Sequence, residues 1–397
     1  MPNEFTELIE SFTAAEASIS KLFSREQDGV GVRTLVARGG PKYQAKLAEA
    51  ATFIGAVFEG HRPMWQLKEA LSTDDFPLLF GDTIDRLLLA KYKAITPEWN
   101  RFMKVTRTIK DFRDVKRFRA SIGRGMTDFV PTGGDYAADA PTEESYSFAV
   151  AKYGRRRDIL WEALVNDDLD ALQSTPDDLA KQAANREAFF ATARYAGNTT
   201  LYGNHTVNGT TYTNKFTLPL NAENLATVVS AMGEFPGDDA DGTPIVNDPI
   251  YIVVGTRKKQ MEAEQILNSL VVLQGADVTG ANLSTAALIP AQLRNRMQVV
   301  YDPFMRMVEP THYQTAWYLF CDPADGWAVE IGYLLGHDTP ELYMKAANQI
   351  RLGAGAAIEG DFDTDARSYK IVHVIGGSHT NAVGGWRFSA WSDGSGA

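Results

Sequence analysis

Apolar residues recur along much of the chain at intervals of three and four, the spacing that buries one face of a helix. The clearest helix is predicted over 175–195, where Thr175 is a suitable N-cap and Pro176 fits the first helical position. Gly197 supplies the stop signal for this helix. The residues that repeat with helical spacing are Leu179, Ala183, Arg186, Phe190 and Ala193.

The same periodicity covers the first part of the chain. Residues 3–24 show an amphipathic pattern, and 43–57 and 64–71 read as two further helices. We therefore expect residues 1–72 to form an N-terminal helical arm. A helix with one apolar face needs a partner to cover it, so this arm is suited to self-association.

A second periodicity, of two residues, marks the strands. Tyr146, Phe148 and Val150 alternate with small or polar residues, as in a half-buried strand. The preceding stretch, 121–142, is rich in glycine and proline and cannot sustain a helix. Loops of this length are uncommon inside compact domains, so we expect a projecting, two-stranded arm that contacts something else and returns at Gly154.

Beyond residue 215, short helices alternate with short strands. Helices are predicted at 225–232, 257–268 and 290–296. Strands are predicted at 250–254, 297–301, 317–321, 327–333 and 369–375. The turn residues at 322–326 predict a hairpin between the strands on either side. Gly376 and Gly377 are expected to end the last strand.

The composition leaves these predicted elements unchanged, but it argues against binding to nucleic acid or to a membrane. The chain has 397 residues, 44% of them hydrophobic, which is enough for a large core and two or three domains. Its formal net charge of -11 argues against general affinity for nucleic acid, so DNA would be enclosed and not bound. Residues 102–118 are locally basic, but Asp111 and Asp114 interrupt them, and a solvated strand face explains the pattern better. No apolar stretch is long enough for a membrane span, and synthesis in the cytoplasm is expected.

The residues offer no catalytic or cofactor motif. The single cysteine, Cys321, follows an apolar run and is interpreted as a buried, inert thiol. The six histidines never fall at the spacings of zinc sites. The sequence also contains no nucleophile elbow, phosphate loop or dinucleotide fingerprint. We therefore predict no catalytic residue, no metal and no cofactor.

Taken in order, these elements resemble the major capsid proteins of tailed bacteriophages, which share the Hong Kong 97 fold. The similarity covers about residues 74–391 and lies in the order of the pieces, since each piece alone is weak. Residues 121–153 resemble the extended loop that overlaps a neighbouring subunit, and 175–195 the spine helix of the peripheral domain. Residues 221–343 resemble the axial domain. The stretches 76–89 and 164–169 are similar in amino-acid sequence to head subunits of transposable phages and prophages.

The resemblance implies an α+β fold with the Hong Kong 97 arrangement and a set of domain limits. These are an N-terminal helical arm at 1–72, the start of the peripheral domain at 73–120, the extended loop at 121–153, the peripheral domain with its spine helix at 154–215, the axial domain at 216–345, and the return strand with the C-terminus at 346–397. Some members join subunits covalently through a loop lysine, but 126–151 contains no lysine, so no such bond is expected. Many members lose an N-terminal segment to a protease, whereas residues 1–72 are expected to remain here.

The implied function is a head subunit that is not an enzyme. It would assemble with copies of itself into pentamers and hexamers and close an icosahedral shell around double-stranded DNA, without sequence-specific binding and without a membrane. Portal, scaffold and cement proteins are further candidate partners. Assembly would occur in the host cytoplasm, and the product would be part of the virion.

The residues expected to contact neighbouring subunits fall in three places. Phe129 and Tyr136 stand near the loop tip. Arg155, Arg156 and Arg157 stand at its base, where arginine can pair with acids across an interface. Asp238, Asp239 and Asp241 are expected near a symmetry axis. For each group, an ordinary solvated charge cluster is the alternative.

Three other functions stay open on the sequence alone. The first is an encapsulin-like nanocompartment with the same fold, whose inner surface binds a cargo enzyme; the long N-terminal arm disfavours it. The second is an α+β enzyme whose site is assembled from residues distant in sequence. The third is a phage tail or tube subunit, which would form rings and rods instead of closed shells.

Overall fold

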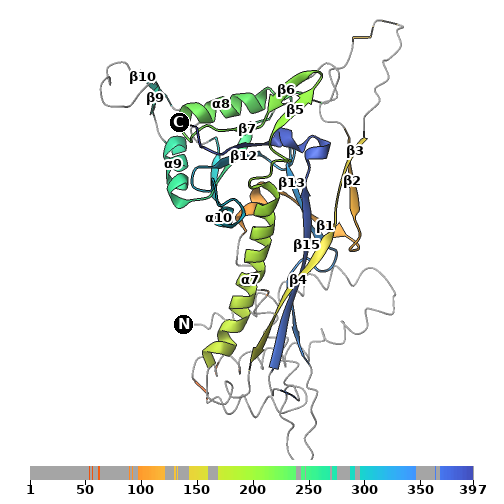
Figure 1. Ribbon diagram of the computed structural model, residues 1–397. Helices are drawn as coiled ribbons and strands as arrows, with labels where there is room; N and C mark the ends of the chain where they lie inside the picture. Colours follow the sequence, from red (N-terminus) through yellow and green to blue (C-terminus); the bar gives the residue numbers. More distant parts are fainter. Residues whose placement is uncertain are drawn as a thin grey trace, which may run out of the picture. The chain divides into compact units, whose positions relative to one another are not determined.

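The computed structural model shows a mixed α+β protein (Figure 1). It describes residues 97–120, 143–159, 169–237, 247–268, 296–345 and 367–396, and shorter stretches at 53, 56, 61–62, 89, 92, 129–130, 132, 243–245, 271–274, 287–290 and 363. The expected N-terminal arm, residues 1–72, lies almost entirely outside these described residues. The chain divides into two compact units. Beyond residue 96, unit 1 contains the described residues within 153–184 and 339–373, and unit 2 contains the rest.

The core of unit 2 is a five-stranded sheet with the order β11-β8-β12-β16-β7. Its strands are β7 (Lys215–Phe216), β8 (Pro249–Val254), β11 (Gln298–Tyr301), β12 (Trp317–Cys321) and β16 (Ser389–Ser392). β8 runs parallel to β11 and antiparallel to β12, and every residue of β12 and β16 is buried. Strands buried on both faces read as continuous apolar runs, which is the pattern of 317–321.

Three helices belong to this part of unit 2: α8 (Ala222–Gly233), α9 (Arg257–Asn268) and α10 (Met305–Val308). Asn221 is the N-cap of α8, and its side chain accepts a hydrogen bond of 2.7 Å from the Asn224 backbone N–H. Leu225, Val228 and Met232 are the buried face of α8, at intervals of three and four. The helices predicted at 225–232 and 257–268 are therefore confirmed.

Aromatic side chains fill the interior where the end of the long helix α7 (Leu169–Tyr195) meets this sheet. The ring of Tyr195 stands edge-on to those of Tyr318 and Phe320, with centroids 5.1 and 5.4 Å apart. The Tyr195 hydroxyl donates to the buried Asp302 carboxylate at 2.5 Å, and Thr192 donates to the same oxygen. Burial raises the pKa of Asp302, because few water molecules reach its charge.

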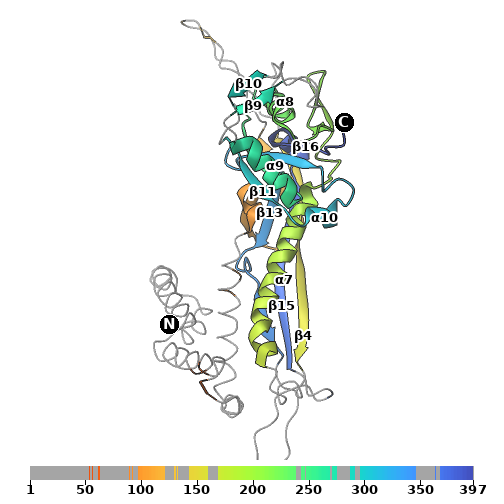
Figure 2. The same ribbon diagram turned by 90° about the vertical axis from the view of Figure 1, so that its left-hand side faces the viewer.

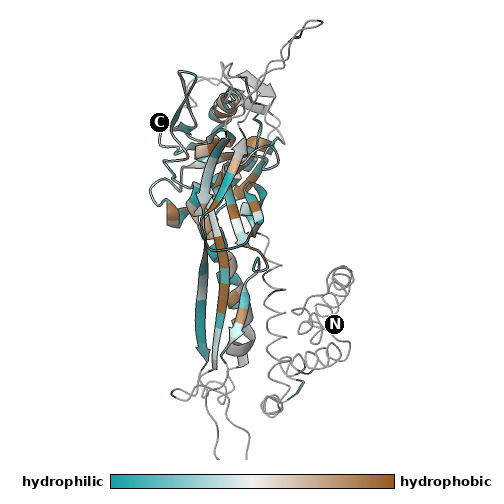
Figure 3. Ribbon diagram, turned by 90° about the vertical axis from the view of Figure 1, so that its right-hand side faces the viewer, coloured by the Kyte–Doolittle hydropathy of each residue, from teal (hydrophilic) through white to brown (hydrophobic). Residues whose placement is uncertain are grey.

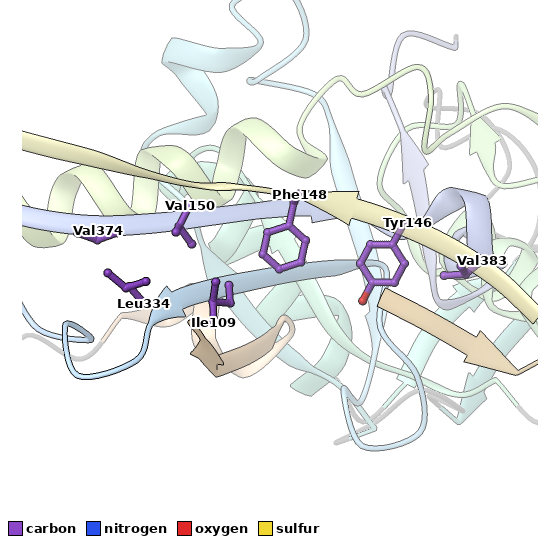
Figure 4. Close-up of a cluster of buried hydrophobic side chains, with 7 residues drawn as sticks. All are labelled: Ile109, Tyr146, Phe148, Val150, Leu334, Val374 and Val383. Atoms are coloured by element: carbon purple, nitrogen blue, oxygen red, sulfur yellow. The ribbon is translucent and has the colours of Figure 1, made fainter. Parts of the chain in front are cut away.

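A second sheet in unit 2 contains β13 (Val329–Leu334), which pairs in parallel with β1 (Lys104–Ile109) and antiparallel with the later part of β15 (Arg367–His379). β2 (Val115–Ala120) and β3 (Glu143–Phe148) form a separate antiparallel pair. Buried side chains gather between these strands (Figure 4), and they are Ile109, Tyr146, Phe148, Val150, Leu334, Val374 and Val383. The alternation predicted for Tyr146, Phe148 and Val150 is confirmed, since all three are buried.

Two glycines make the close packing of this sheet possible. Gly332 in β13 and Gly376 in β15 are register partners. A methyl group on Gly332 would collide with Ile109 and would lie 2.7 Å from the Phe148 ring. A methyl group on Gly376 would collide with the Ala149 carbonyl oxygen and would lie 2.7 Å from the Val150 Cα. The chain at 149–150 therefore crosses β15 at a distance that no side chain permits.

Unit 1 contains the first part of α7, the later part of β4 (Val150–Ile159), β14 (Glu341–Met344) and the first part of β15. β14 pairs antiparallel with β15. Leu179, Ala180 and Ala183 of α7 pack on Ile371 of β15. Figure 2 shows α7 running beside β4 and β15, and Figure 3 shows hydrophilic and hydrophobic residues interleaved along the described strands.

The long helix differs from its prediction at the start. α7 begins at Leu169, so Thr175 and Pro176 lie within the helix and Thr175 is not its N-cap. The sequence also has Asp167 and Asp168 just before Leu169, a residue type suited to a cap position. Two members of the predicted buried stripe, Arg186 and Ala193, are exposed. The end of the helix is as predicted, with Gly197 at φ +61.

The hairpin predicted around 322–326 is wrong. β12 pairs with β8 and β16, whereas β13 pairs with β1 and β15, so the turn carries the chain from one sheet to another. The turn packs tightly instead, because Gly326 lies directly against the Phe388 ring. The break predicted at Gly376 and Gly377 is also wrong, since β15 continues through both residues to His379.

Some short strands were not predicted. β5 (Asn204–Val207) and β6 (Thr210–Thr213) form a hairpin within the turn-rich stretch that precedes residue 215. Asn208 and Gly209 both have positive φ, at 49 and 79, as a two-residue type I′ turn requires. β9 (Val271–Gln274) and β10 (Ala287–Pro290) form another pair. The helix predicted at 290–296 lies mostly outside the described residues, and Pro290 itself ends β10.

His205 of the β5–β6 hairpin lies partly buried against a tryptophan ring. The His205 ring stacks on Trp386, with centroids 4.2 Å apart and an interplanar angle of 9°, and the guanidinium of Arg387 lies 4.7 Å from the same indole. Burial, and to a lesser degree the Arg387 charge, lower the pKa of His205 below its usual value, so the folded protein disfavours its protonation.

Replacing His205 with phenylalanine should therefore reduce the loss of stability in acid. A histidine whose pKa is lowered by folding stabilises the protein above its unfolded pKa of about 6.5, and this contribution is lost as the pH falls below that value. Phenylalanine keeps the stacking contact without titrating. Urea unfolding at about pH 7.5 and about pH 5 should give a smaller difference in the free energy of unfolding for His205→Phe than for the wild type. An unchanged difference would exclude His205 as a source of the acid sensitivity.

Candidate functional site

Three exposed phenylalanine side chains of unit 2 lie on and next to the β2–β3 pair. Phe118 of β2 is 67% exposed, Phe112 in the turn before β2 is 49% exposed, and Phe129 in the segment between β2 and β3 is 91% exposed. Isolated two-stranded sheets are only marginally stable in water. The β2–β3 pair, with the segment 121–142 that it encloses, is called the arm below. The strand predicted around Tyr146 and Phe148 is confirmed as β3, whereas the projection predicted for 121–142 lies almost entirely outside the described residues.

The base of the arm is held by one buried carboxylate. Glu330 of β13 is 3% exposed. One of its oxygens accepts a hydrogen bond of 2.5 Å from the Thr106 hydroxyl of β1 and lies 3.5 Å from the Arg117 guanidinium of β2. Its other oxygen accepts a hydrogen bond from the Tyr146 hydroxyl of β3. Arg117 and Tyr146 are directly opposite each other in the β2–β3 register. Glu330 therefore contacts three strands, including both strands of the arm.

The electrostatics of this anchor are those of a buried, satisfied charge. Burial and the neighbouring Glu330 raise the pKa of the Tyr146 hydroxyl, so it stays protonated and remains a donor. Trp327 approaches the same hydroxyl with its indole N–H at 3.5 Å. A carboxylate without such partners would be costly to bury, so removing any of them weakens the site.

The three arginines predicted at the base of the loop lie on β4, after the arm, and contact groups of their own chain. Arg156 forms an ion pair of 2.7 Å with Asp158, two residues along the same strand. Arg157 forms an ion pair of 3.3 Å with Asp178 of α7. Arg155 lies 3.5 Å from the side-chain oxygen of Gln182. All of these contacts are at the surface, where such pairs contribute little to stability. Gly154, where the loop was expected to return, lies within β4, and the strand continues to Ile159.

Of the other predicted contact residues, one is exposed and four lie outside the described residues. Phe129 is almost fully exposed. Tyr136, Asp238, Asp239 and Asp241 lie outside the described residues. Contact of these residues with neighbouring subunits therefore stays a prediction.

The residues of the anchor were missed at the sequence level. A signal was present, because Glu330 interrupts a strand of apolar residues from Val329 to Leu334. A charged residue in such a strand is either on an exposed face or buried with partners. The partners Thr106, Arg117 and Tyr146 lie far from it in sequence, so the pattern alone could not identify them.

The described part of the chain shows no candidate metal centre. Its His, Cys, Asp and Glu residues form no group of three or more that could hold a metal ion. Cys321 is buried, and burial, followed by the charges of Asp325, Asp248 and Asp322, raises the pKa of its thiol. Among the helices that the structure describes, none has a segment long and apolar enough to cross a membrane.

Comparisons with known proteins agree on one class. A family model described as phage capsid protein matches residues 143–388. No curated protein matches the chain. Solved structures similar to the chain include the capsid of cyanophage P-SCSP1u, with 11% identity, a TM-score of 0.45, and 73% of this chain and 85% of the other covered. The capsid of cyanophage Pam1 gives 9% identity and a TM-score of 0.43, with 75% of this chain and 91% of the other covered. The acid-stable capsid of Helicobacter pylori bacteriophage KHP30 gives 11% identity and a TM-score of 0.39, with 73% of this chain and 88% of the other covered.

Proposed function

Because the chain belongs to the phage capsid protein family and is therefore a structural, non-enzymatic subunit of a viral shell, we propose that it forms pentamers and hexamers that close into an icosahedral head. In this proposal the fold has the Hong Kong 97 arrangement, with the domain limits expected from the sequence. The shell encloses double-stranded DNA, is assembled in the host cytoplasm, and receives portal, scaffold or cement proteins as further partners.

The observation that carries the proposal is the exposure of apolar side chains on the arm. Its base is tied to β13 by the buried Glu330, whereas Phe118 and Phe129 are exposed to solvent. Large exposed apolar side chains mark surfaces that become buried in an assembly. A second copy of the chain supplies that surface when many identical subunits form one shell.

The net charge supports enclosure of DNA over direct binding. With 50 acidic and 39 basic residues, the chain repels a polyanion overall. A closed shell retains DNA by geometry and needs few specific contacts with it. Arg155, Arg156 and Arg157, and the acidic residues Asp238, Asp239 and Asp241, are proposed as surface charges that face neighbouring subunits.

Negative-stain electron microscopy of the purified recombinant chain, together with size-exclusion chromatography, tests the proposal. We expect closed shells or capsomer rings. Nuclease-protected double-stranded DNA inside the shells would distinguish a head from a nanocompartment, which would contain protein cargo instead. A uniform monomer or small dimer under all salt conditions would contradict the proposal, and rods would indicate a tail or tube subunit.

Phe129→Ser should separate assembly from folding. Phe129 is 91% exposed within its own chain, so a polar residue there should leave the unfolding midpoint unchanged. Loss of a buried apolar contact in the shell should weaken each inter-subunit contact by about 2 kcal/mol and reduce the assembled fraction by more than about tenfold. The readout is the ratio of shell to free subunit in size-exclusion chromatography. A variant that assembles like the wild type would remove Phe129 from the proposed contact.

A further inference from the structure

The charges exposed at the two ends of the β11-β8-β12-β16-β7 sheet of unit 2 are of opposite sign. β8 and β11 are parallel, and both end on the side where α9 and α10 begin. Arg257, Lys258 and Arg306 are exposed on those two short segments. Lys259 is also there, but it is paired with Glu262 at 2.7 Å. This end of the sheet, with Met261 and Met307, is called the basic end. Figures 1 and 2 show α9 and α10 close together.

The other end of the sheet carries acids. β12 runs antiparallel to β8, so Cys321 at the end of β12 lies beside Pro249 at the start of β8. Asp248 precedes β8, and Asp322 and Asp325 follow β12; all three lie near enough to influence the Cys321 thiol. Asp248 and Asp325 are exposed. Arg296, which precedes β11, and the buried Arg387, which precedes β16, stand at this end too, so the acids are in excess by one charge. This group is called the acidic end.

The cations of the basic end are placed against the local preference of the helix. Thr256 is positioned to cap α9, because its hydroxyl accepts a hydrogen bond of 3.2 Å from the Lys259 backbone N–H. The first turn of α9 contains no acidic residue, although acids are favoured there by the helix dipole. Placing Arg257 and Lys258 in this turn instead costs stability, on the order of 0.3–1 kcal/mol for each charge. Such a conflict is relieved when a negative surface binds.

Two apolar side chains make a protein the best partner for this surface. Met261 of α9 is 68% exposed and Met307 of α10 is 67% exposed. Methionine packs against protein surfaces of many shapes, but it offers nothing to the phosphates of DNA. Methionine and arginine are both enriched at protein interfaces, whose rims are polar. The chain itself offers the complementary charge at the acidic end, about 20 Å away along β8.

We propose that the basic end of one copy binds the acidic end of the next copy. The contact joins two different surfaces of the same chain, so each copy can bind one neighbour at each end. Contacts of this kind generate rings when the rotation between copies closes. The inference rests on the proposed function, because it identifies the charges that hold one subunit to the next within a pentamer or hexamer.

Charge reversal at both ends tests the contact. Lys258→Glu with Arg306→Glu removes exposed cations for which the described part of the chain shows no ion-pair partner. Like charges then face each other across the contact, and we expect the assembled fraction to fall at least about tenfold at physiological salt. Asp248→Lys with Asp325→Lys should have the same effect. A chain that carries all four substitutions restores opposite charges and should recover assembly.

Matched controls keep the result interpretable. Lys110→Glu with Arg113→Glu changes the net charge by the same amount in the β1–β2 turn, where both residues are exposed, and should assemble normally. Circular dichroism and thermal unfolding establish that each variant is folded. Shells and free subunits are counted by negative-stain electron microscopy and size-exclusion chromatography, and enclosed DNA is measured after nuclease treatment.

The possible failures point to different conclusions. If the wild type does not assemble, the proposed function fails. If the wild type assembles and both charge-reversed variants assemble equally well, the inference fails while the proposed function stands. An equal loss in the control variant, or no recovery in the fourfold variant, would assign the effect to net charge and overturn the contact. Normal assembly with loss of enclosed DNA in Lys258→Glu with Arg306→Glu would assign the basic end to DNA.

Discussion

Replacing Glu330 with alanine is expected to lower the free energy of unfolding by about 3 kcal/mol, one of the two largest effects of a single substitution that we expect. The change removes the acceptor for the Thr106 and Tyr146 hydroxyls and leaves the Arg117 guanidinium without its carboxylate. The alanine also leaves a space at a position that is 3% exposed. Because Arg117 and Tyr146 belong to the two strands of the arm, the base of the arm should loosen as well.

Two comparisons assign this loss to the anchor. Thr106→Val removes one of the hydrogen bonds and should cost about 1 kcal/mol. In the background of Tyr146→Phe, the additional effect of Glu330→Ala should be smaller than in the wild type, because the two side chains act together. Urea unfolding of the four variants gives these values, and hydrogen exchange should show faster opening of β2 and β3 in Glu330→Ala. A loss below about 1 kcal/mol would mean that Glu330 is not an anchor.

Gly376→Ala should be similarly damaging for a different reason. The added methyl group would meet the Ala149 carbonyl oxygen and the Val150 Cα, both of which are backbone atoms that no side-chain rotation can move. The strands must separate, so we expect a loss of about 3 kcal/mol in the free energy of unfolding, or failure to fold at 37 °C. Thermal unfolding of the purified protein, or the soluble yield where no folded protein is obtained, measures the effect.

Gly233→Ala is the matched control for this substitution. Gly233 ends α8 and has no atom within 4 Å of the position that a methyl group would take. Alanine is favoured over glycine in a helix, so this variant should be as stable as the wild type or slightly more stable. If Gly376→Ala matched Gly233→Ala in stability, the close crossing of 149–150 over β15 would be wrong.

Local signals predicted much of the fold correctly. The limits of α9 and the buried strand 317–321 follow from periodicity and from continuous apolar runs. The buried positions Tyr146, Phe148 and Val150 were predicted because alternation is a local property. The end of α7 was predicted because Gly197 takes a positive φ, which glycine adopts readily.

Pairing between distant segments could not be predicted in the same way. The turn at 322–326 has hairpin residues, but the partner of each flanking strand is decided by the rest of the sheet. Gly376 was interpreted as a break because glycine weakens strands, whereas its role is to admit another stretch of backbone. The anchor could not be predicted for the same reason. Glu330 is recognisable as a charged residue in an apolar strand, but its partners come from three other strands of the fold.

The state of Cys321 has a consequence for the finished particle. Its thiol is buried in β12, and its surroundings hold it in the protonated form, which neither attacks disulfides nor reacts readily with oxidants. It is also the only cysteine in the sequence. Copies of the chain therefore have no accessible thiol with which to form a disulfide. No disulfide between subunits should therefore contribute to the stability of the shell. The addition of a reducing agent should leave the fraction of assembled subunits unchanged.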